Sequence, residues 1–506
     1  MNKLKKIFLN MASVKSADDF IDTANKSELK KTLGIFDLII LGIGAVVGTG
    51  IFTIVGVAAK GGPEAVGAGP ALIISMVLAA VACIFTALCY SEFASMIPVA
   101  GSAYTYTYAT MGEFMAWIVG WILMLEYAIG NITVASAWTG YLFQLLKGFE
   151  HVLPSWLVNP PMWLINDYRT VTILCKDQGL NIKEQIPYLF DTIPIAINVP
   201  AIFIVTLLTI LLVKGVREST RLASIMVGLN LCIILSFVVF GAFYVKPENW
   251  APFAPNGIEG ILSGAFIIFF AYIGFDAIST AAEETKNPQR DLPIGILGTL
   301  TICTILYILV TLVLTGMIPF SMIDTHAPIA HAMRFVGQDK MAGLISAGAL
   351  AGLTSVLLVY QLGTTRILYA MSRDNFLPKI LQKVHKKYKT PHVVTWLSGI
   401  IVILGALFMD LNISAELCNF GTFTSFIIVC VAVLILRKTD PDRKRPFRVP
   451  FSPIVPILGI LSCGGLMIYS LGSLKTSAKL FPLWVILGVM FYFIYCYNNQ
   501  RKNENK

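Results

Sequence analysis

Two carboxylates lie in the middle of long apolar runs, where side chains of this type are rare. Glu126 is in the segment LEYAIG (residues 125–130), and Asp276 is in IIFFAYIGFDAIST (residues 267–280). A carboxylate inside a bilayer is costly, and such groups usually face the protein interior and serve an ion or proton pathway. The chemistry expected of Asp276 or Glu126 is therefore reversible proton binding. The alternative for Asp276 is a structural role, as the cap of a half-helix or the partner of another polar group.

Glycines interrupt a third apolar run, in the segment GIGAVVGTGIF (residues 42–52). A dinucleotide-binding fingerprint is disfavoured, because it needs a preceding strand and a soluble βαβ unit. Gly44 and Gly48 form a GxxxG pair, which is typical of a tight helix contact in a membrane. The third interpretation is a helix that breaks at Gly48, Thr49 and Gly50, so that its backbone groups can bind a charged ligand inside a cavity.

A matching interruption favours the broken helix. Gly274 lies in the middle of a later apolar run, beside Asp276. Interrupted spans at corresponding positions of two halves predict a transporter site built from inverted repeats. We therefore expect the two helices to unwind around Gly48 and Gly274, with their backbone forming the binding site.

The composition places these runs in a membrane. The 506-residue chain is 56% hydrophobic and 13% charged, with a mean hydropathy of +0.75, whereas a soluble domain carries about 25% charged residues. The runs lack the period-2 alternation of barrel strands, so the predicted class is an all-α membrane protein. Twelve spans are expected, at residues 35–59, 70–91, 113–144, 198–213, 222–245, 260–282, 293–317, 341–365, 393–409, 417–436, 453–473 and 480–498.

The distribution of Lys and Arg predicts the orientation. If both termini are cytoplasmic, 28 of the 38 Lys and Arg residues fall in cytoplasmic segments, as the positive-inside rule requires. This asymmetry accounts for the net charge of +9, so binding of nucleic acid is not expected. No signal peptide is expected before residue 35. The predicted location is the cell membrane, in contact with the lipid bilayer.

Several other functions are disfavoured. The nine cysteines form no CxxC pair and the five histidines form no recognisable cluster, so neither a metal site nor a disulfide framework is expected. The chain has no GxxxxGK[ST] loop for ATP, and no convincing nucleophile–base pair that would indicate an enzyme. A channel would need a continuous polar lining, which few of the spans offer. No cofactor is expected beyond a coupling proton or sodium ion.

Four segments resemble the amino acid-polyamine-organocation (APC) transporters, and among these the bacterial relatives of the cationic amino acid transporters. They are residues 42–52, PVAGSAYTYTYATMGE (98–113), GFDAISTAAEETKNPQRDLPIGI (274–296) and RILYAMSRDNFLPK (366–379). The resemblance covers about residues 30–500 and implies a LeuT-like fold with a five-plus-five inverted repeat. It divides the chain into a tail (1–34), a first repeat (35–245, with an outer loop at 145–197), a second repeat (258–436), two added helices (453–498) and a second tail (499–506).

The same resemblance implies a secondary transporter that moves amino acids into the cell by alternating access. Thr49 and Gly50 match the positions that bind the substrate carboxylate, which suits N–H groups at the start of a half-helix. The positions that bind the substrate amine through freed carbonyls are matched by Val46, Phe270, Ala271 and Ile273. An amino acid sensor without transport would share these residues. It would need a signalling domain, which the short tails are not expected to provide.

Tyr360, in LTSVLLVYQLGTTR (residues 353–366), matches a pocket position that is small in the arginine and lysine carriers of the family. A tyrosine there fills the volume that a long cationic side chain would need. We therefore expect small neutral amino acids, such as alanine, serine or glycine, to be preferred over arginine. The alternative is that Tyr360 faces another helix and selects nothing.

Coupling is the point at which the chain departs from its relatives. Proton-coupled bacterial members carry a lysine in span five, and the matching residue here is Asn230, which cannot titrate. Proton symport through Asp276 or Glu126 is the first expectation. Uncoupled facilitation or exchange is the second, because the cationic amino acid facilitators also lack this lysine. Sodium symport is the third, with the hydroxyls of Thr354 and Ser355 as ion ligands.

Overall fold

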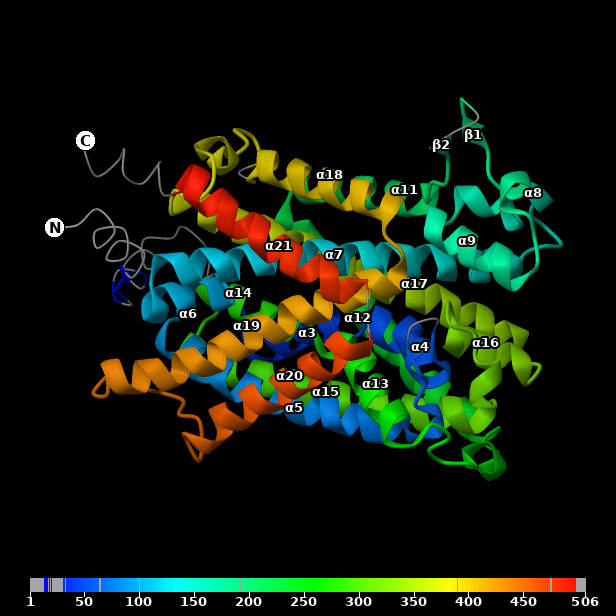
Figure 1. Ribbon diagram of the computed structural model, residues 1–506, viewed down its shortest axis with the longest axis horizontal. Helices are drawn as coiled ribbons and strands as arrows, with labels where there is room; N and C mark the ends of the chain where they lie inside the picture. The colour runs from blue at the N-terminus through cyan, green and yellow to red at the C-terminus, as the bar shows by residue number, and fades with distance from the viewer. Residues whose placement is uncertain are drawn as a thin grey trace.

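The computed structural model describes residues 13–16, 18, 20, 31, 33–62, 65–99, 101–190, 193–388, 390–473 and 476–496. Long helices run side by side along the molecule (Figure 1). The helices of the first half are α3 (Ile35–Val46), α4 (Val55–Lys60), α5 (Leu72–Met96), α6 (Ser102–Met111), α7 (Glu113–Lys147), α11 (Val199–Lys214) and α12 (Val216–Ala242). A five-residue π-helix, η1 (Gly50–Ile54), leads into α4.

The second half begins with two short half-helices and continues with longer ones. They are α13 (Gly257–Phe269), α14 (Ala277–Thr280), α15 (Pro288–Met317), α16 (Pro328–Phe335), α17 (Asp339–Arg373), α18 (His392–Phe408), α19 (Leu411–Thr439), α20 (Ile454–Ser473) and α21 (Ser477–Phe491). Between α13 and α14 lies the 3₁₀ turn η5 (Phe270–Tyr272).

The described chain confirms an all-helical membrane protein but does not confirm the count of twelve spans. Nine helices are long and apolar enough to cross a membrane, and the bent pair formed by Ile35–Val46 and Gly50–Lys60 raises the number to ten. The two remaining expected spans correspond to α11 and α18, which have 16 and 17 residues. A straight helix of that length falls short of the ~20 residues that a span requires.

The segment between α7 and α11 folds into a small unit of its own, which we call the loop cap (residues 148–190 and 193–198). It contains α8 (Ser155–Val158), α9 (Tyr168–Asp177), α10 (Ile182–Gln185) and an antiparallel pair of two-residue strands, β1 (Tyr188–Leu189) and β2 (Ile193–Pro194). Its own apolar core is Val171, Cys175, Ile186 and Ala196. Since α7 continues to Lys147, the loop begins slightly later than expected.

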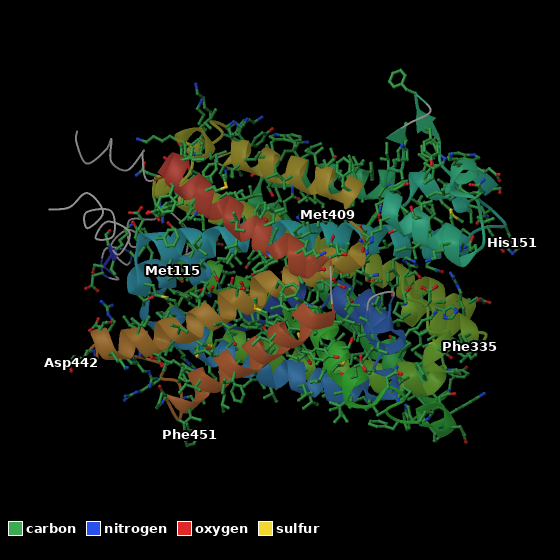
Figure 2. The ribbon with its side chains drawn as sticks, viewed as in Figure 1. Met115, His151, Phe335, Met409, Asp442 and Phe451 are labelled. Atoms are coloured by element: carbon green, nitrogen blue, oxygen red, sulfur yellow. The ribbon has the colours of Figure 1, made fainter. Side chains whose placement is uncertain are left out.

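The two ends of the bundle differ in character (Figure 2). His151 and Phe335 lie at the end that carries the loop cap, and Asp442 and Phe451 lie at the opposite end. The opposite end also receives the basic C-terminal turns of α17, which ends at Arg373, and of α19, which ends at Thr439. We call the two the cap end and the basic end.

Burial follows the expectation for a helix bundle in lipid. The central helix α7 is buried along most of its length, whereas α20 and α21 expose large apolar side chains such as Leu461, Ile468, Leu483 and Ile486. Apolar side chains on the outside of a bundle are stable in contact with lipid. The polar groups of the site must therefore lie between α7 and the helices that surround it.

Candidate functional site

The first helix is broken near its middle. Helix α3 ends at Val46, and Val47 leaves the helical region at φ −83° and ψ 88°. The chain resumes as η1 at Gly50 and continues into α4, with a bend of 41° between the two halves. The break thus spans residues 47–49; Thr49 within it, and Val46 and Gly50 on either side of it, are all buried.

The second broken helix depends on Gly274. After the 3₁₀ turn of η5, Ile273 is extended (φ −65°, ψ 137°), and Gly274 has φ +118°. A side chain is strained at that φ. A Cβ on Gly274 would also lie 2.9 Å from the carbonyl oxygen of Ala45 in α3. Glycine is therefore required here both for the turn and for the close approach of α3.

The two breaks touch each other. A Cβ on Gly50 would lie 2.3 Å from Cα and Cβ of Ala271, so no side chain fits between the two backbones. The other glycines of the segment also serve packing: a Cβ on Gly48 would meet Val356 at 2.4 Å, and one on Gly44 would meet Val227 at 2.6 Å. The packing interpretation and the broken-helix interpretation therefore describe the same segment.

Tyr307 of α15 joins the two breaks and was missed by the sequence reasoning. Its hydroxyl lies 2.8 Å from the carbonyl oxygen of Val46 and 2.8 Å from that of Ala271. These are two of the four carbonyls assigned to the substrate amine. A hydroxyl has a single proton, so it can donate to only one of them at a time. The only signal in the sequence was a tyrosine inside an apolar span.

The carbonyls of Ile273 and Phe270, also predicted to bind the substrate amine, already accept hydrogen bonds of different kinds. The carbonyl of Ile273 accepts a hydrogen bond of 3.3 Å from the hydroxyl of Tyr360, which is 2% exposed. The carbonyl of Phe270 accepts the N–H of Ile273 at 3.2 Å within its own turn. Tyr360 thus reaches the break of the second helix, and its ring packs edge-on against Tyr127, with centroids 5.7 Å apart.

The two carboxylates lie close to the second break and are almost fully buried. Tyr127 of α7 donates a 2.8 Å hydrogen bond to Oδ2 of Asp276. Within the described chain, Oδ1 of Asp276 and Oε2 of Glu126 accept no hydrogen bond, and no Lys, Arg or His forms an ion pair with either residue. Asp276 makes no capping bond to α14. Both carboxylates therefore lack a counter-charge.

Neutral donors satisfy the carbonyls at the end of α3. The amide Nδ2 of Asn230 donates to the carbonyl of Val47 at 3.0 Å, and the hydroxyl of Ser355 donates to that of Gly44 at 3.3 Å. The hydroxyl of Thr354 points elsewhere, since it donates to Leu350 at 2.7 Å and accepts from Trp138 at 3.1 Å. Of the two hydroxyls assigned to a sodium ion, only that of Ser355 contacts the first broken helix.

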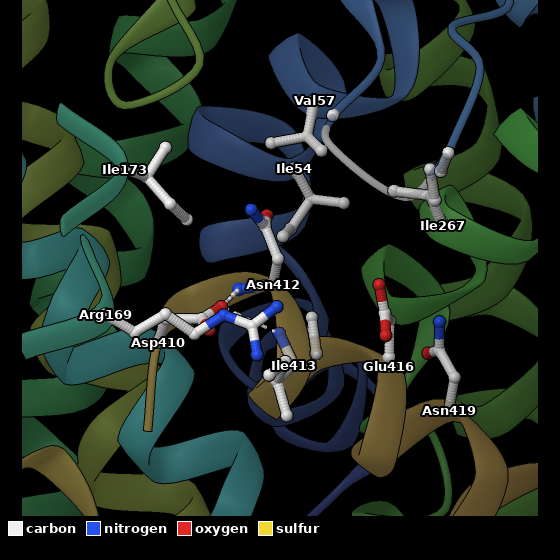
Figure 3. Close-up of a pocket in the computed structure, with 13 residues that line it drawn as sticks. Ile54, Val57, Arg169, Ile173, Ile267, Asp410, Asn412, Ile413, Glu416 and Asn419 are labelled. Carbon is white, nitrogen blue, oxygen red and sulfur yellow. Dashed lines mark hydrogen bonds and ion pairs between the residues drawn. The ribbon is translucent and has the colours of Figure 1, made fainter. Parts of the chain in front are cut away.

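A small pocket lies on the cap-end side of the two breaks (Figure 3). Its walls come from α4, α13, α9 and the start of α19, and its volume of about 40 Å³ has room for a few water molecules. Nε of Arg169, in the loop cap, lies 2.9 Å from Oδ2 of Asp410. Oδ1 of Asp410 accepts the N–H groups of Asn412 and Ile413 and so caps α19. Burial raises the pKa of Asp410, although these donors and Arg169 oppose the shift.

Two of the ion pairs at the basic end lie at the C-terminal end of α17. Lys15 lies 3.1 Å from Asp374 at the end of α17, and the hydroxyl of Tyr104 donates to the same carboxylate at 2.8 Å. Arg366 pairs with Glu284 at 2.6 Å. Leu33, just before α3, also exchanges backbone hydrogen bonds with the chain that follows α14. The starts and ends of the two broken helices are thus tied together at this end.

Comparison with known proteins identifies the family. A family model described as amino acid permease matches residues 33–493. The methylthioribose transporter of Bacillus subtilis is 43% identical over 481 residues, which cover 95% of this chain and 96% of that protein. The branched-chain amino acid permease BcaP of B. subtilis is 43% identical over 492 residues (97% and 98%), and the chloroplastic cationic amino acid transporter 9 of Arabidopsis thaliana is 37% identical over 454 residues (89% and 74%).

These matches confirm the resemblance to the APC transporters. Together with the apolar helices, they show an integral protein of the plasma membrane. The chain belongs to the amino acid permease family of the APC superfamily.

Proposed function

We propose that this permease is a secondary active transporter that brings amino acids into the cell by alternating access, on a LeuT-like five-plus-five inverted repeat with two added helices. The observation that carries the proposal is the contact of two broken helices, Gly50 against Ala271, in the interior of the bundle. Irregular backbone at membrane depth is tolerated only where it is buried in protein or lines a cavity. We infer that both termini are cytoplasmic, because the positive-inside rule predicts this from the distribution of Lys and Arg along the sequence.

An amino acid zwitterion fits the polarity of the breaks. The N–H groups of Thr49 and Gly50 lie at the start of the half-helix that runs to Lys60, where an anion is favoured. The substrate ammonium, with three donors, binds the carbonyls of Val46 and Ala271. It replaces the hydroxyl of Tyr307 at one or both of them. The backbone thus binds the carboxylate and ammonium groups, which all amino acids share.

Alternating access would open one end of the bundle at a time. The ion pair between Arg169 and Asp410 closes the cap end, and the pairs Lys15–Asp374 and Arg366–Glu284 close the basic end. In the described structure both ends carry their ion pairs, as an occluded intermediate would. Import then needs the first pair to open before binding and the other two to open for release.

Proton coupling through Asp276, with Glu126 as its neighbour, is the proposed energy source. An isolated charge in this environment is costly, and each carboxylate has one oxygen without a hydrogen-bond partner in the described chain. A bound proton is the simplest way to remove the charge. Uncoupled exchange is the alternative, favoured by the neutral Asn230. A sodium ion would have Ser355 as its hydroxyl ligand, since that of Thr354 is engaged with Trp138.

The proposed substrates are neutral amino acids with small side chains, since the ring of Tyr360 occupies the space beside Ile273. Branched-chain amino acids are the second candidate, because the relative BcaP is a branched-chain amino acid permease. The equally similar methylthioribose transporter makes a neutral thioether sugar the third. That compound has neither the carboxylate nor the ammonium that the broken helices suit.

The test is uptake of radiolabelled alanine into proteoliposomes under a pH gradient, a sodium gradient or neither. We expect alanine to accumulate only under the pH gradient. Unlabelled serine and glycine should inhibit alanine uptake more strongly than leucine, arginine or methylthioribose does. Equilibration without accumulation in all three conditions would contradict proton coupling and favour exchange. Uptake of methylthioribose with no response to any amino acid would overturn the proposed substrate class.

A further inference from the structure

A groove separate from the transport site lies at the basic end, on the outside of the bundle. It is formed by the first two turns of α15 and by the segment that connects α19 to α20. Its volume is about 400 Å³, and its lining includes Gln289, Arg290, Ile294, Leu297, Pro446 and Phe447. None of these residues belongs to the breaks or to the ion pairs described above.

The lining changes from charged to apolar along α15. Arg290 is in the first turn of this helix, and Ile294 and Leu297 follow it at the four- and three-residue intervals that keep side chains on one helix face. Ile294 is 40% exposed. At 1.5 Å per residue, the seven positions from Arg290 to Leu297 span about 10 Å. The groove therefore has a cation near the start of the candidate span Pro288–Met317 and apolar walls further along it.

Some basic residues around the groove have no ion-pair partner in the part of the chain that the structure describes, unlike their neighbours. Arg437 and Arg445 bind the buried carboxylate of Glu92, and Arg443 pairs with Asp440. Three other cations, Arg290, Lys444 and Arg448, are exposed and form no ion pair with any described residue. Lys444 and Arg448 flank the two residues of this segment that line the groove. Unpaired positive charge is thus concentrated at its polar edge.

We propose that this groove binds an anionic phospholipid of the cytoplasmic leaflet. The phosphate and headgroup lie against Arg290, Lys444 and Arg448, and an acyl chain lies along Ile294, Leu297 and Phe447. Basic pockets between membrane helices on the cytoplasmic side suit such headgroups. Arg290 gains a further benefit, because a cation in the first turn of a helix is disfavoured by the helix dipole unless an anion accompanies it. A soluble phosphate compound would leave the apolar walls uncovered.

The lipid is placed to influence transport through α15, a consequence that rests on the proposed function. A Cβ on Gly295 would lie 3.0 Å from Cβ of Leu38 in α3, and the hydroxyl of Thr299 donates to the carbonyl of Ile39 at 3.3 Å. The two helices are therefore closely packed next to the groove. A lipid that fastens α15 to the α19–α20 segment restrains the movement of α3, the first half of the broken helix.

Native mass spectrometry of the full-length protein tests the site without using transport. The probes are phosphatidylglycerol and phosphatidylcholine with identical acyl chains, and inorganic phosphate as a competitor. We expect preferential retention of phosphatidylglycerol, and about tenfold or greater loss of that preference in the variant R290Q/K444Q/R448Q. The matched control K379Q/K383Q/K386Q removes three exposed lysines at the same end and should keep the preference.

A second variant tests the apolar half of the site. Ile294→Trp fills the groove without a change of charge and should weaken phosphatidylglycerol binding while the melting temperature in detergent is retained. Equal binding of the two lipids, an unchanged preference in R290Q/K444Q/R448Q, or complete displacement by inorganic phosphate would each overturn the proposal. These outcomes are independent of alanine uptake, so a failure of the lipid site and a failure of the transport proposal can be told apart.

Discussion

Replacing Tyr307 by phenylalanine should strengthen substrate binding while it weakens the empty protein. The hydroxyl lies 2.8 Å from the carbonyls of both Val46 and Ala271. Its loss leaves a buried acceptor without a donor, at a cost of about 1–3 kcal/mol. In the substrate complex the ammonium supplies that donor, so most of the cost falls on the empty state. Water can hydrate the unpaired carbonyl in the empty protein and so reduce this cost. If the empty state is still destabilised by about 1 kcal/mol relative to the substrate complex, the Kd for the substrate falls about fivefold.

The assay is equilibrium binding of radiolabelled alanine to purified protein, together with the melting temperature with and without ligand. For Tyr307→Phe we expect a lower melting temperature without ligand and a larger upward shift on binding. Tyr272→Phe is the matched control, because it also removes a buried hydroxyl that donates to a backbone carbonyl, that of Met76 at 3.2 Å. This control should lose stability with an unchanged Kd. A higher Kd in Tyr307→Phe with a normal Kd in the control would refute the reasoning, since Tyr307 would then bind the substrate directly.

Four further predictions follow from the same contacts. Gly274→Ala should abolish uptake and cost about 1–3 kcal/mol of stability, because φ is +118° there; Gly228→Ala, in open space, should be neutral in both assays. Asp276→Asn should remove accumulation driven by a pH gradient and retain exchange of alanine across the membrane; retained accumulation would exclude Asp276 as the coupling group. Burial raises the pKa of Asp410, so this carboxylate takes up a proton at a higher pH than an ordinary aspartate does. Its ion pair with Arg169 should therefore be lost as the external pH falls through that pKa. Cysteine-accessibility labelling of the cap-end pocket should therefore increase on acidification, and Asp410→Asn should remove that response. Tyr360→Ala should increase the competition of leucine and arginine with alanine; an unchanged competition series would mean that this ring does not limit side-chain size.

The positions of the two breaks could be predicted from the sequence because their causes are local. Glycine is the residue type that tolerates φ +118° at position 274, and a carboxylate two residues later marks a polar interior. Membrane burial follows just as directly from long apolar runs. In each case the signal can be recognised within a short segment, although Gly274 is also required by the close approach of α3.

Other parts of the site could not be predicted because they depend on contacts between distant segments. The role of Tyr307 requires α3 and η5 to meet within reach of one hydroxyl from α15. The same is true of Trp138, whose indole N–H binds the hydroxyl of Thr354 and turns it away from the first helix. The count of twelve spans is not confirmed, because α11 and α18 have 16 and 17 residues, fewer than the ~20 of a typical span.

The donors around α3 bear on Asn230, the residue expected from the resemblance to stand where proton-coupled members of the superfamily have a lysine. A helix that ends inside a membrane leaves carbonyls that have no N–H partner within the helix. Three of these oxygens receive donors from three different helices: Gly44 from Ser355, Val46 from Tyr307 and Val47 from Asn230.

All three donors are neutral, so these carbonyls can be hydrogen-bonded without a sodium ion or an ammonium group, with the single proton of Tyr307 shared between Val46 and Ala271. A cation that bound at the end of α3 would have to displace these hydrogen bonds. None of the three donor side chains carries a negative charge that could balance it. The unpaired carboxylates lie instead on the other broken helix and on α7, at Asp276 and Glu126. Asn230 therefore supplies a neutral donor to the broken end, and the proposed titrating role falls to Asp276 and Glu126.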